Sequence, residues 1–389
     1  MRLLGRRVHI AGSASPSIDP TLIVHAHEVV RRLVRNVLSE GATLVVQAGG
    51  EPRTNGPDLA SPPLLFDWTV MEEAYACLEG GMAQPSRNGE LLLFAVSSEK
   101  AQSEMPTNRH PLWDSLLRLH AVQVRCIRPG SRSGAMMREL QAREGNVLVT
   151  LGGGAGVEHL ADMYARRRRP VVPLDPRIGS SRDDGTVGGE GLARLARMDT
   201  TPFFRLLQPG TEEARLAAAT TGNGRAEPAV VADRVLALLM DLVPPTAFFV
   251  RLVNRDHPEF RSVESFFRDV IEPVAGEAGY QRHEVGTDET RDPFMNVEIF
   301  NELHHAPMII ADLTGERPNC YLELGYALRG EAKVLITAKQ GTKLPFDTQA
   351  LPCHFWRDDL DESSRRASFQ DFWRRNINRP RLVQPDVPF

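Results

Sequence analysis

Two carboxylates, Asp312 and Glu323, stand at the two ends of a short polar stretch. The apolar residues before Asp312 predict a buried strand, and the residues after the stretch predict a helix with Asn319 as its N-cap. Glu323 is then expected in about the first turn, where the helix dipole favours a carboxylate. Open α/β sheets bind ligands outside the carboxyl ends of their strands, so both carboxylates are expected at a ligand-binding edge.

A carboxylate at such an edge suits cleavage of an N-glycosidic bond. That reaction builds oxocarbenium character on the sugar, which a carboxylate stabilises or captures covalently. Glu323 is the candidate for this role, while Asp312 would hold ribose hydroxyls or orient Glu323. The spacing leaves a plainer alternative open, in which Glu323 is a favourable first-turn residue and Asp312 only caps the strand end.

A second polar loop, at 254–257, follows the apolar strand predicted at 247–253. Asn254 and Arg255 are candidates for binding a base or a phosphate, since a guanidinium pairs well with phosphate oxygens. A solvated surface loop is an equal alternative. Neighbouring His304 and His305 point apart on a helix and lack a spaced third ligand, so no metal site is predicted.

Glycines gather at three predicted strand ends in the first half of the chain. The longest run lies between an apolar strand and a helix, where backbone N–H groups and a helix N-terminus form a cradle for phosphate. Parallel strands bring such ends to one edge, so the sequence predicts a nucleotide pocket there, although many glycine loops are only tight turns. The candidate binding residues are Gly12, Ser13, Gly49, Gly50, Gly152, Gly153, Gly154, Gly156 and Glu158.

Strands and helices alternate on both sides of Pro244-Pro245, which predicts α/β folds with parallel sheets. The Pro-Pro pair ends a helix, so we expect two domains, 1–245 and 246–389. Between about 175 and 225 the composition shifts to glycine-rich, flexible segments with two short helices.

The composition narrows the class of protein. A length of 389 residues favours two domains, and a net charge of −4 gives no case for nucleic-acid or anionic-membrane binding. We expect a cytoplasmic protein with four reduced cysteines, because the sequence holds no membrane span, no signal-peptide pattern and no CxxC spacing.

The stretch from Ile310 to Ala327, with Asp312, Asn319, Glu323 and Tyr326 in it, resembles a signature of nucleoside 2-deoxyribosyltransferases and TIR domains. The resemblance extends to Leu344-Pro345-Phe346-Asp347 and covers about 246–356. It implies a flavodoxin-like domain in which Glu323 breaks the bond between ribose and a base or nicotinamide. Asn319 and Asp312 would then lie near the sugar, and Tyr326 near the substrate.

Residues 7–174 resemble a SLOG domain, the Rossmann-like family that includes cytokinin-activating LOG enzymes and nucleotide-sensing modules of anti-phage effectors. Those enzymes carry a Pro-Gly-Gly-x-Gly-Thr-x-x-Glu loop. Here Leu151 replaces the Pro, Val157 replaces the Thr, and Glu158 follows at once. The departure favours ligand sensing over catalysis in this domain.

Together these resemblances predict an anti-phage effector that forms oligomers. A nucleotide-derived signal of the cyclic ADP-ribose type would activate hydrolysis of NAD or a related nucleotide, with no further cofactor. A constitutive deoxyribosyltransferase or nucleotide hydrolase, and a non-catalytic nucleotide-binding scaffold, are the two alternatives.

Overall fold

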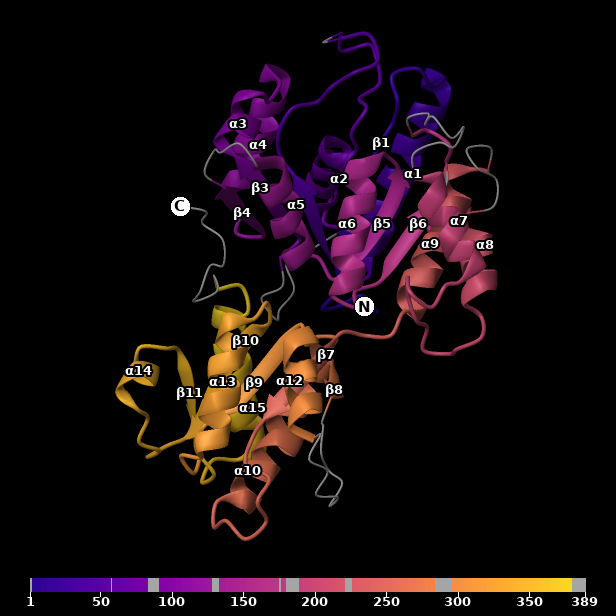
Figure 1. Cartoon of the computed structure of the whole chain (residues 1–389). Coiled ribbons are helices and arrows are strands. Elements are labelled where there is room, and N and C mark those ends of the chain that lie inside the picture. The colour runs from indigo at the N-terminus through magenta and orange to yellow at the C-terminus, as the bar shows by residue number, and fades with distance from the viewer. Residues whose placement is uncertain are drawn as a thin grey trace. The chain divides into compact units, whose positions relative to one another are not determined.

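The chain divides into two compact units, one ending at Val243 and the other beginning at Pro244. The computed structural model describes residues 2–56, 58–82, 91–127, 133–174, 176–179, 189–220, 226–283 and 295–379. Within these residues, no helix combines the length and the apolar character that a membrane span needs. Each unit is an α/β fold with one parallel sheet, as the alternation of elements predicts (Figure 1).

The N-terminal unit is built on a six-stranded sheet with the order β4-β3-β2-β1-β5-β6. Every neighbouring pair in it is parallel. Its strands are β1 (Arg7–Ser13), β2 (Thr43–Gln47), β3 (Leu93–Ser98), β4 (Val122–Ile127), β5 (Val147–Gly152) and β6 (Val171–Leu174). The chain runs outward from β1 to β4 and then returns to the other side of β1 with β5, so the order reverses between β1 and β5.

Helices cover both faces of this sheet, because its central strands carry apolar side chains on both sides. One core lies among β-strand residues and helices α1, α2 and α9, and two smaller cores lie on the side of α5 and α6. The helices are α1 (Pro20–Ser39), α2 (Asp67–Glu79), α3 (Glu99–Ser103), η1 (Thr107–Arg109), α4 (His110–Leu117), α5 (Ser133–Glu144), α6 (Ala155–Arg166), α7 (Glu190–Met198), α8 (Glu212–Thr220) and α9 (Pro228–Asp241).

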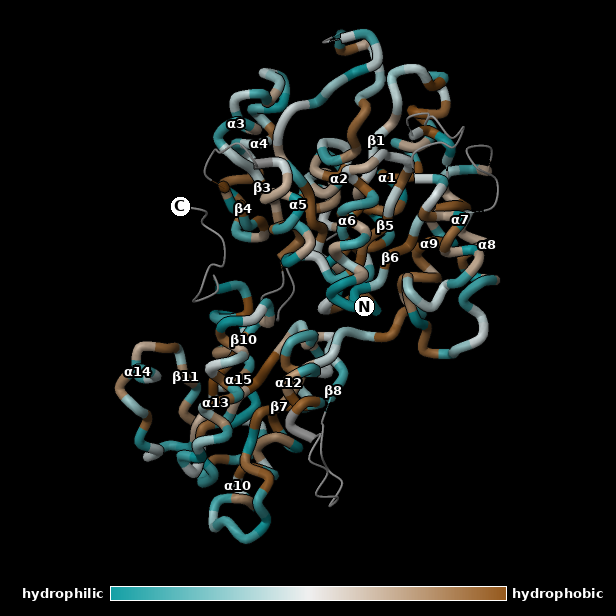
Figure 2. The backbone as a smooth tube through the Cα atoms, viewed as in Figure 1, coloured by the Kyte–Doolittle hydropathy of each residue, from teal (hydrophilic) through white to brown (hydrophobic). Residues whose placement is uncertain are grey.

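The C-terminal unit has a five-stranded parallel sheet with the order β11-β10-β9-β7-β8. In chain order this is 2-1-3-4-5, the flavodoxin-like arrangement, with its switch point between β7 and β9. The strands are β7 (Thr246–Val250), β8 (Gln281–His283), β9 (Met308–Asp312), β10 (Lys333–Lys339) and β11 (Cys353–Trp356). Figure 2 marks β7 and β6 as hydrophobic segments, as expected for strands buried on both faces.

Two separate cores pack against this second sheet. An aromatic core around Phe266, Phe267, Trp356, Phe369 and Trp373 covers one face, and an aliphatic core under α12 and α13 covers the other. The helices are α10 (Phe260–Phe266), a π-helical turn η2 (Phe267–Ile271), α11 (Glu272–Glu277), α12 (Met295–His305), α13 (Pro318–Arg329), α14 (Phe346–Gln349) and α15 (Glu362–Asn376).

Several elements, the short helices α3 and α14 among them, were not predicted from the sequence. β4 and β11 are edge strands with short or mixed patterns, and neither was predicted. The Trp-containing tail after Trp356 forms α15, which Asp361 caps by accepting a hydrogen bond from the Ser364 amide at 3.0 Å. The glycine-rich segments at 180–188 and 221–225 lie outside the described residues, while α7 and α8 form between them.

Candidate functional site

The loop between β9 and α13 carries both carboxylates of the C-terminal unit. Helix α13 begins at Pro318, with Arg317 as its N-cap, so the prediction of Asn319 as N-cap was wrong. Proline suits the first helical position, since it has no N–H to leave unpaired there, and the helix starts two residues earlier than predicted. Glu323 therefore lies in the second turn, where the helix dipole contributes less than in the first.

Glu323 is half-buried, and burial raises the pKa of its carboxyl, while nearby Arg317 acts in the opposite direction. No hydrogen bond or ion pair to Glu323 occurs in the described part of the chain. Side chains on a helix lean toward its N-terminus, so this carboxylate projects back toward Arg317 and the β9–α13 loop. Glu323 is thus a carboxylate of raised basicity without a structural partner.

Asp312 has a different environment, because it is fully buried at the end of β9. Its Oδ1 accepts a hydrogen bond from the Thr314 amide at 3.0 Å. Its Oδ2 accepts from Thr337 Oγ1 at 2.7 Å and from Trp356 Nε1 at 2.9 Å. Burial raises the pKa of Asp312, and these three hydrogen bonds lower it. The side chain ties β9 to β10 and β11, and its complete burial leaves no surface for a ribose hydroxyl to contact.

The remaining predicted residues of this unit lie in two places. Asn254 and Arg255 are exposed on the β7–α10 loop, where Asn254 Oδ1 accepts from the Asp256 amide at 3.1 Å. Asn319 is exposed in the first turn of α13. Tyr326 lies one turn beyond Glu323, where its ring packs edge-on against Phe300 at 5.0 Å and lines a shallow apolar groove between α12 and α13.

The β7–α10 and β9–α13 loops meet at the switch point of the sheet. The His257 ring lies so close to Gly315 that a Cβ on Gly315 would stand 3.1 Å from Nε2. Gly315 and Glu316 both have positive φ, 83° and 53°, and Glu316 is one of few non-glycine residues here in that region. The structure thus brings His257 beside the loop that precedes Glu323, a contact that residue spacing does not reveal.

In the N-terminal unit, the glycine loops meet at the switch point between β1 and β5. Ser13 pairs with Gly152 across the two strands, and the Gly153 amide donates to the Ser13 carbonyl at 2.7 Å. A Cβ on Gly12 would stand 2.0 Å from the Leu151 carbonyl oxygen. Gly152 and Gly153 have positive φ, at 59° and 94°. Close packing of the chain therefore accounts for Gly12, Gly152 and Gly153.

Gly154 and Gly156 have more freedom, and they begin helix α6. Gly154 is its N-cap, and the nearest group to a Cβ on Gly156 would be Arg138 Nη1, at 3.8 Å. Arg138 comes from α5, and its buried Nε has no hydrogen-bond partner in the described residues. A cation beside an open helix N-terminus is suited to an anion, and only the packing of α5 on α6 brings it there. Sequence reasoning missed Arg138. Glu158 lies in the first turn of α6, with Oε1 3.8 Å from a Cβ placed on Gly191.

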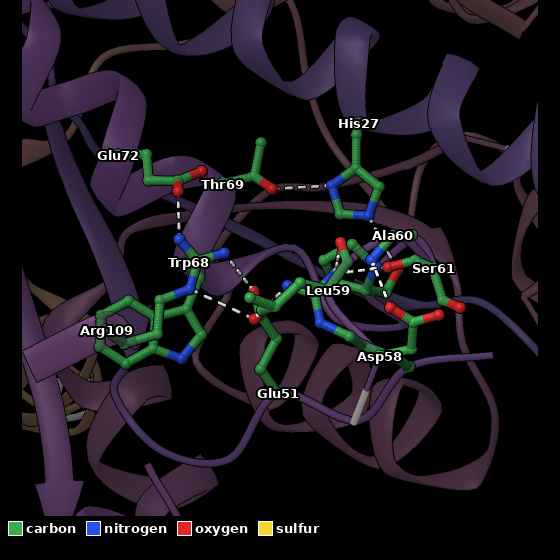
Figure 3. A network of polar contacts seen from close by, with 12 residues as sticks. His27, Glu51, Asp58, Leu59, Ala60, Ser61, Trp68, Thr69, Glu72 and Arg109 are labelled. Carbon is green, nitrogen blue, oxygen red and sulfur yellow. Dashed lines mark hydrogen bonds and ion pairs between the residues drawn. The ribbon is translucent and has the colours of Figure 1, made fainter. Parts of the chain in front are cut away.

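Gly49 and Gly50 lead from β2 into a buried polar network (Figure 3). The Gly49 carbonyl accepts from Trp68 Nε1 at 2.9 Å, which fixes this turn. Next comes Glu51, whose fully buried carboxylate pairs with Arg53 at 2.7 Å and with Arg109. The Arg109 guanidinium lies 5.6 Å from the centre of the Trp68 ring. Gly49 and Gly50 share the strand-end edge, but their surroundings are packed.

Comparison with known proteins assigns the N-terminal unit to a family. A family model described as "ATP nucleosidase Cap17-like, N-terminal" matches residues 3–227. The chain belongs to this family. Two proteins named ATP nucleosidase Cap17, from Escherichia coli strain KTE188 and from Escherichia coli, are each 29% identical to it over 178 residues. The match covers 46% of this chain and only 34% of each relative, so most of each relative lies outside the shared region.

Proposed function

We propose that this Cap17-like chain is a nucleotide N-glycosidase whose C-terminal unit cleaves the bond between ribose and base through Glu323. The observation that supports it best is the state of Glu323 itself. It is a half-buried carboxylate with a raised pKa, on the helix that follows the strand at the sheet's switch point. A carboxylate held this way is more basic than one in water, which strengthens it toward the sugar carbon or toward water.

The chemistry needs one water molecule and no cofactor. The C1′–N bond breaks with its electrons moving to the base, and Glu323 stabilises or captures the sugar cation. Water then adds to C1′, and its proton leaves through the carboxylate. The products are the free base and a ribose phosphate. Asn254, Arg255 and Asn319, exposed around this edge, would hold the phosphate and the sugar.

ATP is the first substrate to test, because the relatives carry the name ATP nucleosidase. NAD is the second, because its ribose–nicotinamide bond is of the same kind. The decisive experiment incubates the purified full chain with ATP, NAD and a deoxynucleoside, and separates the products by chromatography. Release of adenine or nicotinamide supports the proposal, whereas transfer of deoxyribose between bases would support a metabolic transferase instead. Intact substrates under all conditions would point to a binding scaffold.

We assign a sensing role to the N-terminal unit within the same proposal. The open first turn of α6 and Arg138 together suit the phosphates of a nucleotide signal, and Glu158 suits its ribose hydroxyls. The signal would favour an assembled, active state over an inactive one, which requires different affinities for the two. The activated enzyme would then deplete nucleotides. This depletion is the expected contribution to defence against phage.

Activation is tested by repeating the cleavage assay with cyclic ADP-ribose-type molecules and by following sedimentation in parallel. Cleavage that begins only with the signal, together with faster sedimentation, is expected. Equal rates with and without a demonstrably bound signal would contradict the sensing role and leave the glycosidase assignment intact.

A further inference from the structure

The strand-end edge of the C-terminal unit holds one histidine with an unused ring nitrogen. His257 lies on the β7–α10 loop, half-buried against Gly315 of the β9–α13 loop. Its Nδ1 accepts a hydrogen bond from the Glu259 amide at 3.1 Å. An accepting Nδ1 places the proton of the neutral ring on Nε2. Within the described residues, Nε2 has no hydrogen-bond partner, and it lies beside Gly315 in the loop that follows β9.

A network of polar contacts holds the elements around His257 in place. Lys339 at the end of β10 pairs with Glu259 at 2.7 Å and with Asp358 at 2.6 Å. The Lys339 amide also donates to Thr314 Oγ1 in the β9–α13 loop, at 2.8 Å. These contacts connect the ends of β7, β9, β10 and β11 at one edge. They also hold Glu259, whose amide donates to the His257 ring, at this edge.

We propose that His257 Nε2–H donates a hydrogen bond to the leaving base and so stabilises the charge that builds on it. This inference rests on the proposed N-glycosidase function. Glu323 lies about 8 Å along the axis of α13 from Pro318, and its side chain leans back toward the loop that His257 contacts. A nucleotide bound at the switch point can therefore present its sugar to Glu323 and its base to His257.

The proton balance of the step is simple. As the C1′–N bond breaks, its electrons pass to the base nitrogen, and His257 Nε2–H donates a hydrogen bond to a ring nitrogen of adenine that carries part of this charge. Water supplies hydroxide to C1′, and its proton passes by way of Glu323 or solvent to the departing adenine, so the histidine keeps its own proton. Adenine is a poor leaving group without this hydrogen bond. Nicotinamide already carries a positive charge in NAD, so it leaves as a neutral molecule and needs no proton.

This difference between bases provides the test. The His257→Asn variant of the full chain is compared with wild type for kcat/KM on ATP and on NAD. GTP and N7-methyl-GTP form a second pair, because the methylated base also leaves as a neutral molecule. We expect a loss of about 100-fold or more for ATP and GTP, the size typical of removing one hydrogen-bond donor to developing negative charge, and less than about threefold for NAD and N7-methyl-GTP.

Two controls separate this role from a structural one. The His305→Asn variant changes a histidine whose Nδ1 donates to the Asn301 carbonyl of its own helix, at 2.8 Å, and should match wild type on all substrates. His257→Gln, which can place an amide N–H near the position of Nε2, should recover part of the activity on ATP. Equal losses on neutral and charged bases, or no loss on either, would overturn the assignment. If wild type cleaves none of the four nucleotides, the proposed function itself fails.

Discussion

Both units have a parallel sheet with a candidate site at the carboxyl ends of its strands, but the residues at the two sites differ. At the switch point of the N-terminal unit the chain places glycines, a helix N-terminus and Arg138, which suit the binding of an anion. At the switch point of the C-terminal unit it places Glu323 and His257, which suit the movement of electrons and protons. The topology of the sheet therefore sets where a site forms. The side chains at that place determine whether the site binds a ligand or catalyses a reaction.

The largest effect should separate chemistry from binding. Glu323→Gln keeps the size of the side chain and removes its charge, so nucleotide cleavage should fall by about 1000-fold. The affinity of the N-terminal unit for cyclic ADP-ribose, measured by calorimetry, should not change. The matched control is Glu362→Gln, an exposed first-turn residue of α15. Full activity in Glu323→Gln would remove the catalytic assignment.

A second experiment tests whether the polar network behind Gly49 and Gly50 holds the N-terminal unit together. Glu51→Gln leaves Arg53 and Arg109 without their shared buried carboxylate, and such a loss costs about 3–5 kcal/mol. Unfolding by denaturant should show a weaker N-terminal transition and an unchanged C-terminal one. Glu72→Gln, whose side chain is 42% exposed, should cost at most about 1 kcal/mol. Equal, small losses of unfolding free energy in the two variants would mean that the Glu51 carboxylate does not stabilise the N-terminal unit more than Glu72 does.

The third experiment tests nucleotide binding by the N-terminal unit, whereas the first tests cleavage by the C-terminal unit. Arg138→Ala should weaken nucleotide binding to the N-terminal unit by about 10- to 100-fold, since a hydrogen bond to a charged group contributes about 1.5–3 kcal/mol. It is measured in the Glu323→Gln background, so that ATP and cyclic ADP-ribose stay intact during titration. Arg166→Ala serves as control, because that side chain is 77% exposed and pairs with Asp162 on its own helix. Unchanged affinity in Arg138→Ala would place the nucleotide elsewhere.

The smallest expected effect is on the pH dependence of the unfolding free energy. Burial lowers the pKa of His27 to about 4, and Nδ1 accepts from Thr69 Oγ1 at 2.7 Å while Nε2 donates to the Pro63 carbonyl at 2.9 Å. A lowered folded-state pKa contributes stability that is complete above the unfolded pKa of about 6.5 and is lost as the pH falls toward 4.

Between pH 7 and 5, wild type should therefore lose about 2 kcal/mol more of its unfolding free energy in the N-terminal transition than His27→Gln does. Denaturant curves at the two pH values give this difference, with the exposed His110→Gln variant as control. Parallel pH responses of wild type and His27→Gln would show that the ring does not titrate on unfolding. In the C-terminal unit, Asp312 acts in the opposite direction, because its raised pKa gives stability that grows as the pH falls.

The alternation of strands and helices, and with it the two parallel sheets, can be predicted from the sequence alone. The apolar residues before Asp312 predicted a buried strand, which is β9, and the residues after the polar stretch predicted a helix, which is α13. Periodicity is a local property, so it survives folding whatever the neighbours are. The edge strands β4 and β11 were missed because their partly exposed patterns are weak.

Which side chains are available to bind or react depends on how the folded chain packs. Asp312 and Glu323 look equivalent in the sequence, but in the folded chain both oxygens of Asp312 accept hydrogen bonds, from Thr314 in the loop after β9 and from β10 and β11. Glu323 has no such partners within the described residues. Arg138 and Gly156 are 18 positions apart, and His257 and Gly315 are 58 apart, yet each pair is in contact. Contacts of this kind depend on how helices and loops pack across a sheet, and no local pattern encodes them.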